Sequence, residues 1–463
     1  MVREVLRPSP GLTMTVRLFT RVDKSGILVT EVWVMADAAL RLKSLLEQLL
    51  ESELPVRIRA WDGSTAGPPD APTLFVRNRR AVRRLLWKPG ELGLARAWVA
   101  GDLDIEGDFY TALGLVSGLV WERGDTRSAL QVLRDPGTRA ALLGLVRLAG
   151  LPLPPAPPRE EIRRTRGHLH TRRSDQRAIS HHYDVGNGFY ETVLGPSMVY
   201  SCAYWPSPDG TLEQAQHDKL DLVCRKLALQ PGQRLLDVGC GWGSMAIHAA
   251  REYGVRVVGI TLSQEQAAYA RKRVADAGLT DRVEIRVQDY RDVADGPYDA
   301  ISSIGMAEHV GSEKYLEYAE DLYRLLAPGG RLLNHQIARR PLSDESAYDL
   351  DGFIDAYVFP DGELAPVGST VTQLERAGFE VRDVEAIREH YALTLRRWVA
   401  NLEAEWQRAV RLAGPGRARV WRLYMAACAL GFERNHLGVN QVLAVRTPES
   451  GVSGMPLRAR TWN

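Results

Sequence analysis

The sequence predicts an α/β protein in which a larger domain built on a parallel sheet follows a smaller α+β domain. Three observations support this prediction. Strand-like and helix-like segments alternate from Leu235 onward, which is typical of βαβ units. The first strand runs into a glycine-rich turn, Gly239 to Gly243, and then a helix. A proline-rich stretch, Leu151 to Pro158, precedes this region and would form a stiff spacer.

The composition excludes several classes of protein. A chain of 463 residues is too long for one ordinary core and predicts more than one domain. The 59 basic residues nearly balance the 57 acidic ones, which argues against a dedicated nucleic-acid-binding protein. The four cysteines show no C-x-x-C spacing, so we expect reduced thiols and no metal site. No segment resembles a secretion signal or a bilayer span, so we expect a cytoplasmic protein.

The residues before the proline-rich stretch predict an accessory domain. Residues 1–35 show no clear periodicity, and we expect this segment to be poorly ordered or irregular. Residues 36–150 predict an α+β domain that begins with a helix over Asp37–Leu50 and carries no catalytic constellation, so lipid binding or dimerisation is its expected role. Residues 151–177 form a predicted linker, rich in proline and then arginine. A solvated linker and a contact with anionic headgroups are the two interpretations of its charge.

The larger domain, 178–463, predicts a parallel sheet. Its first strand ends at Asp237, and four more are predicted at Arg256–Ile260, Val283–Val287, Tyr298–Ile304 and Arg331–Gln336, with helices between them. Ligands of open parallel sheets bind outside the carboxyl ends of the strands. The residues that follow each strand are therefore the candidates for a site.

The turn after the first strand is the strongest single motif. Gly239 and Gly241 remove side chains where a ligand must approach the backbone, and the following helix offers free N–H groups and the positive end of its dipole. A dinucleotide site would show G-x-G-x-x-G. The run here is G-x-G-x-G after Asp237, which is the pattern of S-adenosylmethionine-dependent methyltransferases. A glycine turn of some other α/β domain is the alternative.

Polar residues after the next two strands extend this predicted cofactor site. The corner GITLSQEQ lacks the acid that commonly binds a ribose in methyltransferases and offers Thr261 and Gln266 as hydrogen-bonding groups instead. After the third strand, Asp289 is placed to accept from an adenine amino group while Tyr290 stacks on the ring. Capping of the next helix is the alternative role of this pair.

Six ordered motifs together are more specific than any one of them. HYD, YSCAYW, LDVGCGWG, GITLS, GMAEHVG and the terminal AACALGF…NQV resemble, in order, those of the cyclopropane-fatty-acid synthase family, which includes fatty-acid and mycolic-acid C-methyltransferases. The resemblance covers about Ile179 to Val445 and implies a Rossmann-like class I SAM methyltransferase domain. The family often has Phe where Ala307 stands. The accessory domain resembles that of the long bacterial synthases.

The resemblance implies a reaction as well as a fold. It implies methyl transfer from S-adenosylmethionine to the cis double bond of unsaturated phospholipid acyl chains, through a carbocation that a bound bicarbonate deprotonates. The product is a methylene- or methyl-branched or a cyclopropane fatty acid. An alkene is a weak nucleophile, so a dry pocket must align it with the donor methyl. A methyltransferase for a small soluble acceptor and a non-catalytic lipid-binding protein are the alternatives.

The family's bicarbonate site matches four residues here, Cys202, Glu308, His335 and Tyr391, each of which singly fits an ordinary structural role. The family also has a cysteine matching Cys428 that was long regarded as catalytic. Alkene methylation has no step that needs a thiolate, so a structural role is favoured for Cys428. Aromatic candidates to stabilise the cation are Tyr204, Trp205, Phe353 and Phe359.

The remaining matches concern the cofactor, the substrate and the partners. The family's lid matches His182 and Tyr183, which are expected to contact substrate. The cofactor contacts match Tyr200, Ser201, Gly239, Gly241, Thr261, Leu262 and Gln266. The expected partners are a phospholipid bilayer at the inner membrane surface, with which the protein associates peripherally, a second copy of the chain and, for a branched product, a separate reductase. No nucleic acid partner is expected.

Overall fold

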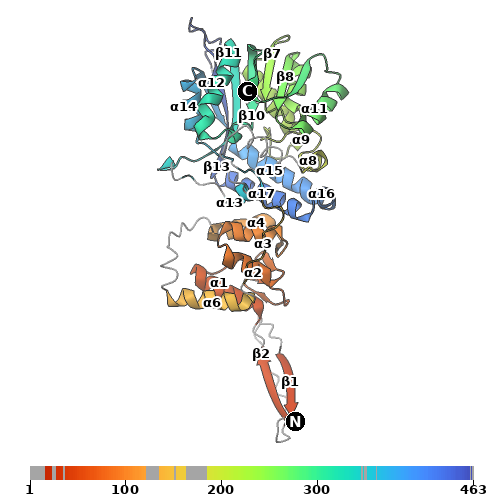
Figure 1. Cartoon of the computed structure of the whole chain (residues 1–463), viewed down its shortest axis with the longest axis vertical. Coiled ribbons are helices and arrows are strands. Elements are labelled where there is room, and N and C mark those ends of the chain that lie inside the picture. The colour runs from red at the N-terminus through yellow and green to blue at the C-terminus, as the bar shows by residue number, and fades with distance from the viewer. Residues whose placement is uncertain are drawn as a thin grey trace. The chain divides into compact units, whose positions relative to one another are not determined.

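The computed structural model describes residues 16–22, 28–34, 37–120, 135–150, 153–162, 185–345, 348, 352–360, 362–458 and 460. The chain divides into two compact units, Met1–Arg159 and Glu160–Asn463 (Figure 1). The division falls within the segment 151–177 that the sequence suggests as a linker. None of the described helices is long and apolar enough to cross a membrane.

The first unit is α+β, as the sequence predicts. Its four-stranded sheet has the order β4-β3-β5-β6, in which only the β3–β5 pair is parallel. Leu42, Ile58, Val82 and Leu145 belong to its apolar core. The elements are α1 (Ala38–Leu50), β3 (Arg57–Arg59), β4 (Thr65–Ala66), β5 (Thr73–Val76), α2 (Arg79–Trp87), α3 (Glu91–Val99), β6 (Leu103–Glu106), α4 (Phe109–Val120) and α6 (Pro136–Ala149).

The structure differs from the expectation for part of the segment 1–35. Strands β1 (Val16–Val22) and β2 (Leu28–Val34) form an antiparallel pair in which Val16 lies opposite Val34. The β-branched and aromatic residues of LVTEVWV are the strand signal that the sequence analysis missed. Residues 1–15, 23–27 and 35 lie outside the described residues.

The second unit contains a seven-stranded sheet of order β12-β13-β11-β10-β7-β8-β9. The five strands from β9 to β11 are parallel and confirm the five predicted from the sequence. β13 is antiparallel to both of its neighbours, β11 and β12. The strands are β7 (Arg234–Val238), β8 (Arg256–Thr261), β9 (Val283–Val287), β10 (Tyr298–Ile304), β11 (Leu326–Arg339), β12 (Glu380–Ala386) and β13 (Leu437–Val445).

Helices cover both faces of this sheet (Figure 1). Neighbouring residues of a strand point to opposite faces, so Leu235 and Leu333 pack in one apolar cluster and Leu236 and Leu332 in the other. The helices are α8 (Asn187–Leu194), α9 (Leu212–Leu227), α10 (Ser244–Tyr253), α11 (Gln264–Asp276), α12 (Tyr315–Leu325), α13 (Gly352–Tyr357), α14 (Val367–Arg376), α15 (Arg388–Ala404), α16 (Trp406–Ala413) and α17 (Pro415–Glu433).

The two clusters assign these helices to layers. The first contains residues of α9, α10 and α11, and the second contains residues of α12 and α14. Helices α15 and α17 pack on each other, and α8 packs on α15 and α16. In Figure 1 this second group lies together beyond one end of the sheet. It therefore forms a cap, separate from the layers, that brings α15 and α17 to the strand ends.

Candidate functional site

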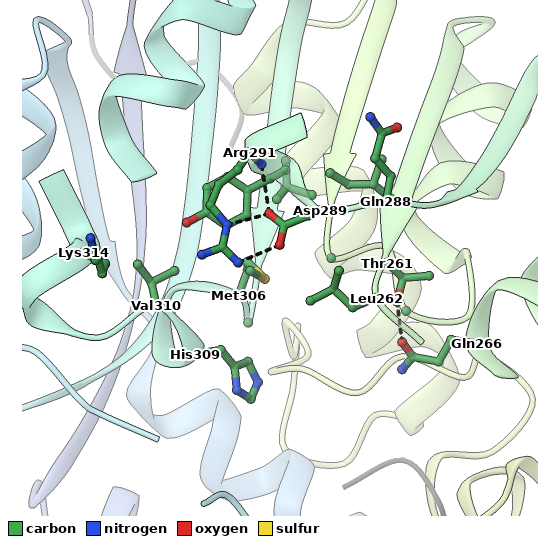
Figure 2. A pocket seen from close by; sticks show the side chains of 16 residues that line it. Thr261, Leu262, Gln266, Gln288, Asp289, Arg291, Met306, His309, Val310 and Lys314 are labelled. Carbon is green, nitrogen blue, oxygen red and sulfur yellow. Dashed lines mark hydrogen bonds and ion pairs between the residues drawn. The ribbon is translucent and has the colours of Figure 1, made fainter. Parts of the chain in front are cut away.

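A hollow lies at the carboxyl ends of β7, β8, β9 and β10. The space between its lining atoms, open solvent included, is about 810 Å³. We call it the strand-end hollow. Its lining residues are Val238, Gly239, Gly241, Ile260, Thr261, Leu262, Gln266, Gln288, Asp289, Tyr290, Arg291, Gly305, Met306, His309, Val310 and Lys314 (Figure 2).

The glycine turn contributes backbone to this hollow. Gly239 and Gly241 have φ of 78° and 53°, in the left-handed region that other residues rarely adopt. The N–H groups of Gly239 and Cys240 both donate to the carbonyl of Ile260, at 3.0 and 2.9 Å, which ties the turn to β8. A Cβ added to Gly239 would lie 3.5 Å from Met306. The turn is therefore held in a shape that leaves its surface free of side chains.

The corner after β8 presents an amide in place of a carboxylate. The Thr261 hydroxyl donates to Oε1 of Gln266 at 2.9 Å, and both side chains are buried (Figure 2). Ser263 caps α11 by accepting from the N–H of Gln266 at 3.2 Å. These two contacts fix the Gln266 amide, whose Nε2 is directed away from Thr261. The corner thus offers a neutral, preoriented donor to a ligand.

The segment after β9 shows the capping role that was the alternative for Asp289. Its carboxylate accepts from the backbone N–H of Arg291 at 3.0 Å and from the guanidinium of the same residue at 2.8 and 2.6 Å (Figure 2). The Tyr290 ring is buried and packs edge-on against Tyr318, with centroids 5.3 Å apart. Both residues line the hollow, as predicted, but their side chains already have protein partners. Arg291 itself was missed by the sequence analysis.

Three residues predicted to contact the cofactor do not line the hollow. Ser201 accepts from the ammonium of buried Lys219 at 3.0 Å. Tyr200 packs among aromatic rings, with Trp398 at 5.4 Å. Oδ1 of Asp237 accepts from the Ser302 hydroxyl at 2.8 Å, while its Oδ2 has no partner among the described residues. Burial raises the pKa of Asp237 to about 6.

Glu308 lies just beyond the hollow, in a 3-10 helix, Ala307–His309, that follows β10. Its Oε1 accepts from the backbone N–H of Ile337 at 2.8 Å, and its Oε2 has no partner among the described residues. Burial raises the pKa of Glu308 to about 7. A carboxyl group with this pKa can hold or release a proton near neutral pH.

His335 lies near the end of β11 and is 2% exposed. Its Nδ1 is 3.3 Å from Nε2 of Gln441, and its own Nε2 has no partner among the described residues. Burial, together with the charges of Lys219 and Lys226, holds the pKa of His335 well below its usual value. The imidazole is therefore neutral at physiological pH.

Tyr391, on α15, joins the other predicted catalytic residues. Burial raises the pKa of its hydroxyl well above the usual value, and the charges of Tyr200, Cys202, Glu308 and Cys428 raise it further. Such charge effects act between neighbouring groups. Tyr391 is thus an electrostatic neighbour of residues from three other segments.

Cys202 is the fourth residue that was matched to the family's bicarbonate site. Its sulfur lies 3.2 Å from the carbonyl of Ala203 and 3.8 Å from that of Ile387. Complete burial raises the pKa of the thiol well above its usual value, so it is a neutral donor and no nucleophile. The buried Lys219 acts on the pKa of both Cys202 and His335, so it is an electrostatic neighbour of each. We call Cys202, Glu308, His335 and Tyr391 the buried acid cluster.

A chain of aromatic rings borders the site. His309, which lines the hollow, packs against Phe359 at 5.6 Å, and Phe359 packs against Tyr424 at 5.8 Å. Tyr424 then contacts Trp421 at 5.9 Å, and Trp421 contacts Tyr200 at 5.8 Å. Sequence reasoning named Phe359 but missed Trp421 and Tyr424, three residues apart on α17. Their helical spacing is a signal that could have found them.

The other three aromatic candidates have ordinary packing partners. Tyr204 stacks on His390 at 4.7 Å. The indole of Trp205 donates to the Thr394 hydroxyl at 3.0 Å. Phe353 packs on Tyr357 within its own helix.

Two predicted substrate residues, His182 and Tyr183, lie outside the described residues. Cys428, on α17, is partly exposed and is an electrostatic neighbour of Tyr391 and Tyr424. Within the described parts of the chain, no group of His, Cys, Asp and Glu side chains could hold a metal ion.

Known proteins resemble this chain in sequence. Residues 170–442 match the model of the family described as mycolic acid cyclopropane synthetase. A probable fatty acid methyltransferase of Mycobacterium tuberculosis is 47% identical over 412 residues, which cover 87% of this chain and 94% of that protein. A probable fatty acid methyltransferase of Pseudomonas putida is 40% identical, over 90% of this chain and 98% of that protein. The cyclopropane-fatty-acyl-phospholipid synthase of Escherichia coli K12 is 38% identical over 58% of this chain and 68% of its own length.

Solved structures resemble the chain over its second part. The cyclopropane synthase MmaA2 from Mycobacterium tuberculosis has a TM-score of 0.55 and 31% identity, covering 60% of this chain and 99% of that one. The mycolic acid cyclopropane synthase CmaA1, complexed with SAH and CTAB, has a TM-score of 0.55 and 34% identity, covering 58% of this chain and 97% of that one.

Proposed function

The chain belongs to the mycolic acid cyclopropane synthetase family and has its class I SAM methyltransferase fold, and from this premise we propose that it methylates cis double bonds in phospholipid acyl chains. The observation that carries the proposal is the pairing of two features at one sheet edge. The glycines Gly239 and Gly241 line the strand-end hollow, and beside it lies Glu308, whose buried Oε2 has no partner among the described residues.

The strand-end hollow fits the methyl donor. S-adenosylmethionine, when bound, supplies an electrophilic methyl group. The bare turn at Gly239 and Gly241 allows close approach to the backbone, and the start of α10 favours negative charge. The fixed amide of Gln266 suits ribose hydroxyls, and the carboxylate of Asp289 lines the same hollow. The solved neighbour that carries SAH supports this assignment.

The buried acid cluster fits a small oxygen anion, which we propose is bicarbonate and which, when bound, supplies a base. Oε2 of Glu308 and Nε2 of His335 are buried without a partner among the described residues, and such atoms are costly unless a ligand satisfies them. Because the pKa of Glu308 is about 7, its carboxyl group can carry the proton that an adjacent anion requires. The Tyr391 hydroxyl and the Cys202 thiol stay protonated and can donate.

The aromatic chain suits the substrate end of the reaction. A cation that forms on an acyl chain survives only where water is excluded and where nearby groups stabilise it without bonding to it. Ring faces such as that of Phe359 meet both conditions.

We extend the proposal to a branched product, because the two relatives that match most of this chain are named for fatty acid methylation and not for cyclopropane formation. The two proteins described as fatty acid methyltransferases match 87% and 90% of this chain, whereas the cyclopropane synthase of Escherichia coli matches 58%. A methylene branch becomes a methyl branch only after reduction, so a separate reductase is part of this proposal. Association with a bilayer surface and self-association also stay predictions.

The test is incubation of the full chain with labelled S-adenosylmethionine and vesicles of an oleoyl phospholipid, followed by mass spectrometry of the acyl chains. We expect the acyl chain to gain one carbon and two hydrogens, and NMR of the product then distinguishes a methylene branch from a ring. Label in a small soluble acceptor, with none in lipid, would favour the soluble-acceptor alternative. Calorimetry that detects no binding of S-adenosylmethionine would favour a non-catalytic lipid-binding protein.

A further inference from the structure

A row of polar side chains crosses three neighbouring strands behind the buried acid cluster. His335 on β11 lies directly opposite Gln441 on β13, and Gln441 lies directly opposite Glu385 on β12. Residues that are opposite in register point to the same face of a sheet, so the three side chains form one line. Their exposed fractions are 2%, 0% and 9%. A polar row this deep in a protein requires hydrogen-bond partners throughout.

Lys226, in the last turn of α9, covers this row. The residue is fully buried, its ammonium donates to Oε1 of Gln441 at 2.8 Å, and it forms an ion pair with Glu385. The carboxylate of Glu385 balances the buried positive charge. Burial lowers the pKa of Lys226, but the hydrogen bond and the charge of Glu385 oppose this shift and favour the cation against the amide of Gln441.

The chemistry of these groups fixes the direction of every hydrogen bond in the row. An ammonium group only donates, so the oxygen of the Gln441 amide must face Lys226 and the NH₂ must face His335. The amide NH₂ also only donates, and Nδ1 of His335, 3.3 Å away, must accept with its lone pair. A neutral imidazole carries one hydrogen, which is then left on Nε2.

We propose that Lys226 and Gln441 are positioning residues that lock His335 in the tautomer with its hydrogen on Nε2. Nε2, which has no partner in the described part of the chain, then always presents an N–H donor to a ligand oxygen in the buried acid cluster. Only the identity of that ligand rests on the proposed function. The locked tautomer follows from contacts within the chain.

The lock restricts what His335 can do in a reaction. A histidine acts as a general base through a free lone pair, and the lone pair of His335 is held by Gln441. His335 therefore serves as a fixed donor. Proton acceptance falls to Glu308 or to an anion held beside it, which agrees with the pKa of Glu308 lying near neutrality.

Substitutions in the row have opposite expected effects on the tautomer. Gln441→Glu puts an acceptor-only carboxylate against Nδ1, so the hydrogen should move from Nε2 to Nδ1. Lys226→Met keeps the length of the side chain but frees the Gln441 amide to rotate, so both tautomers should be populated. Gln441→Met also removes the lock and serves if the carboxylate prevents folding.

The experiment is long-range ¹H–¹⁵N NMR of the full chain with ¹⁵N-labelled histidine at neutral pH, without added ligand. The chain has 10 histidines, so the His335 signals are assigned by comparison with His335→Asn. We expect the Nε2–H tautomer in the unmodified chain, the Nδ1–H or doubly protonated form in Gln441→Glu, and a mixture in Lys226→Met and Gln441→Met. The Nδ1–H tautomer in the unmodified chain, or an unchanged Nε2–H tautomer in all of the folded variants, would overturn the proposal.

Gln336→Glu is the matched control. It makes the same Gln-to-Glu change at the residue that follows His335 on β11. The Gln336 amide is buried and bonds to Tyr315, Asn334 and Thr370 and not to His335. The His335 signals should stay those of the Nε2–H tautomer. A tautomer change in this control would mean that any buried charge nearby shifts the imidazole, and the lock would be refuted.

Kinetics separates positioning from general support of the fold. We expect Gln441→Glu to lower kcat by about 10- to 100-fold, as for loss of other groups that orient a functional histidine, while KM for S-adenosylmethionine changes little. An unchanged kcat in a variant whose tautomer has moved would refute the positioning role. A locked Nε2–H tautomer in a chain that does not methylate phospholipid would refute the proposed function and leave the lock standing.

Discussion

The strand-end hollow and the buried acid cluster lie at the same sheet edge but are built in opposite ways. In the hollow, polar side chains already have protein partners, as in the Thr261–Gln266 and Asp289–Arg291 pairs. In the cluster, Glu308 and His335 each keep a buried atom without a partner among the described residues. The first region is complete without a ligand, whereas the second needs one to satisfy its hydrogen bonds. This difference supports the proposal that the hollow holds the methyl donor and that the cluster carries the proton chemistry.

Glu308→Gln, in the buried acid cluster, should have the largest effect on catalysis. The amide keeps the size of the side chain but cannot exchange a proton, so we expect kcat for methyl transfer to fall by about 10²- to 10⁴-fold. Calorimetry should show unchanged affinity for S-adenosylmethionine, because Glu308 does not line the hollow. Unchanged turnover would remove Glu308 from the mechanism.

The same variant should be more stable than the unmodified chain above neutral pH. Burial raises the pKa of Glu308 from 4.5 to about 7, so the folded state holds its proton more tightly than the unfolded state does. Ionisation therefore costs about 3 kcal/mol of folding free energy above pH 7, and that cost disappears below pH 4.5.

Chemical denaturation of both proteins across this pH range measures the effect. We expect the free energy of unfolding of Glu308→Gln to rise relative to that of the unmodified chain as the pH increases from 4.5 to about 7. Below pH 4.5 this difference should stay constant, which provides the internal control. A gain that is the same at every pH would show that the Glu308 carboxyl group does not ionise at a raised pKa.

Gly239→Val should weaken cofactor binding in the strand-end hollow. The left-handed φ of Gly239 costs a branched residue about 1–2 kcal/mol, and the new side chain would meet Met306. We expect affinity for S-adenosylmethionine to fall at least about tenfold. Gly278→Val is the matched control, because Gly278 has a φ of 68° and open space around it, away from the hollow. Equal loss of affinity in both variants would contradict a specific role of the turn.

Tyr391→Phe should lower kcat without weakening the binding of S-adenosylmethionine. Loss of one hydrogen-bond donor, worth about 0.5–1.5 kcal/mol, should lower kcat up to about tenfold and leave affinity for S-adenosylmethionine unchanged. Steady-state kinetics with calorimetry measures both quantities. A variant that loses affinity instead of kcat would move Tyr391 from the cluster to the hollow.

Cys428→Ala should have the smallest effect. The proposed chemistry needs no thiolate, so we expect kcat to change by less than about threefold, the scale of a small packing change. A loss of about 10²-fold, with the unfolding midpoint preserved, would show that the thiol takes part in the reaction.

The two regions also differ in how far the sequence predicts them. The hollow comes from short segments that directly follow strands, so the motif around Gly239 and Gly241 and the corner at Thr261 were accessible to local patterns. Seven of the ten residues predicted for the cofactor line it, and Asp237, Tyr200 and Ser201 do not. Those three lie close in sequence to the hollow, but their side chains bond elsewhere.

The cluster depends on contacts that no local pattern shows. The register of β11, β13 and β12 brings His335, Gln441 and Glu385 into line, and β12 and β13 were not predicted from the sequence. A lysine near the end of a helix, such as Lys226, ordinarily suggests solvent exposure. Its burial becomes visible only when α9 is packed on the sheet. The four residues of the cluster were identified through the resemblance to a family and not through their spacing.

The bicarbonate dependence of methyl transfer tests this account most directly. In buffer freed of carbon dioxide, we predict that kcat for methyl transfer to oleoyl phospholipid falls at least about tenfold, recovers when bicarbonate is added, and leaves the affinity for S-adenosylmethionine unchanged. A rate independent of bicarbonate in the unmodified chain would contradict the claim that the buried acid cluster is completed by an anion.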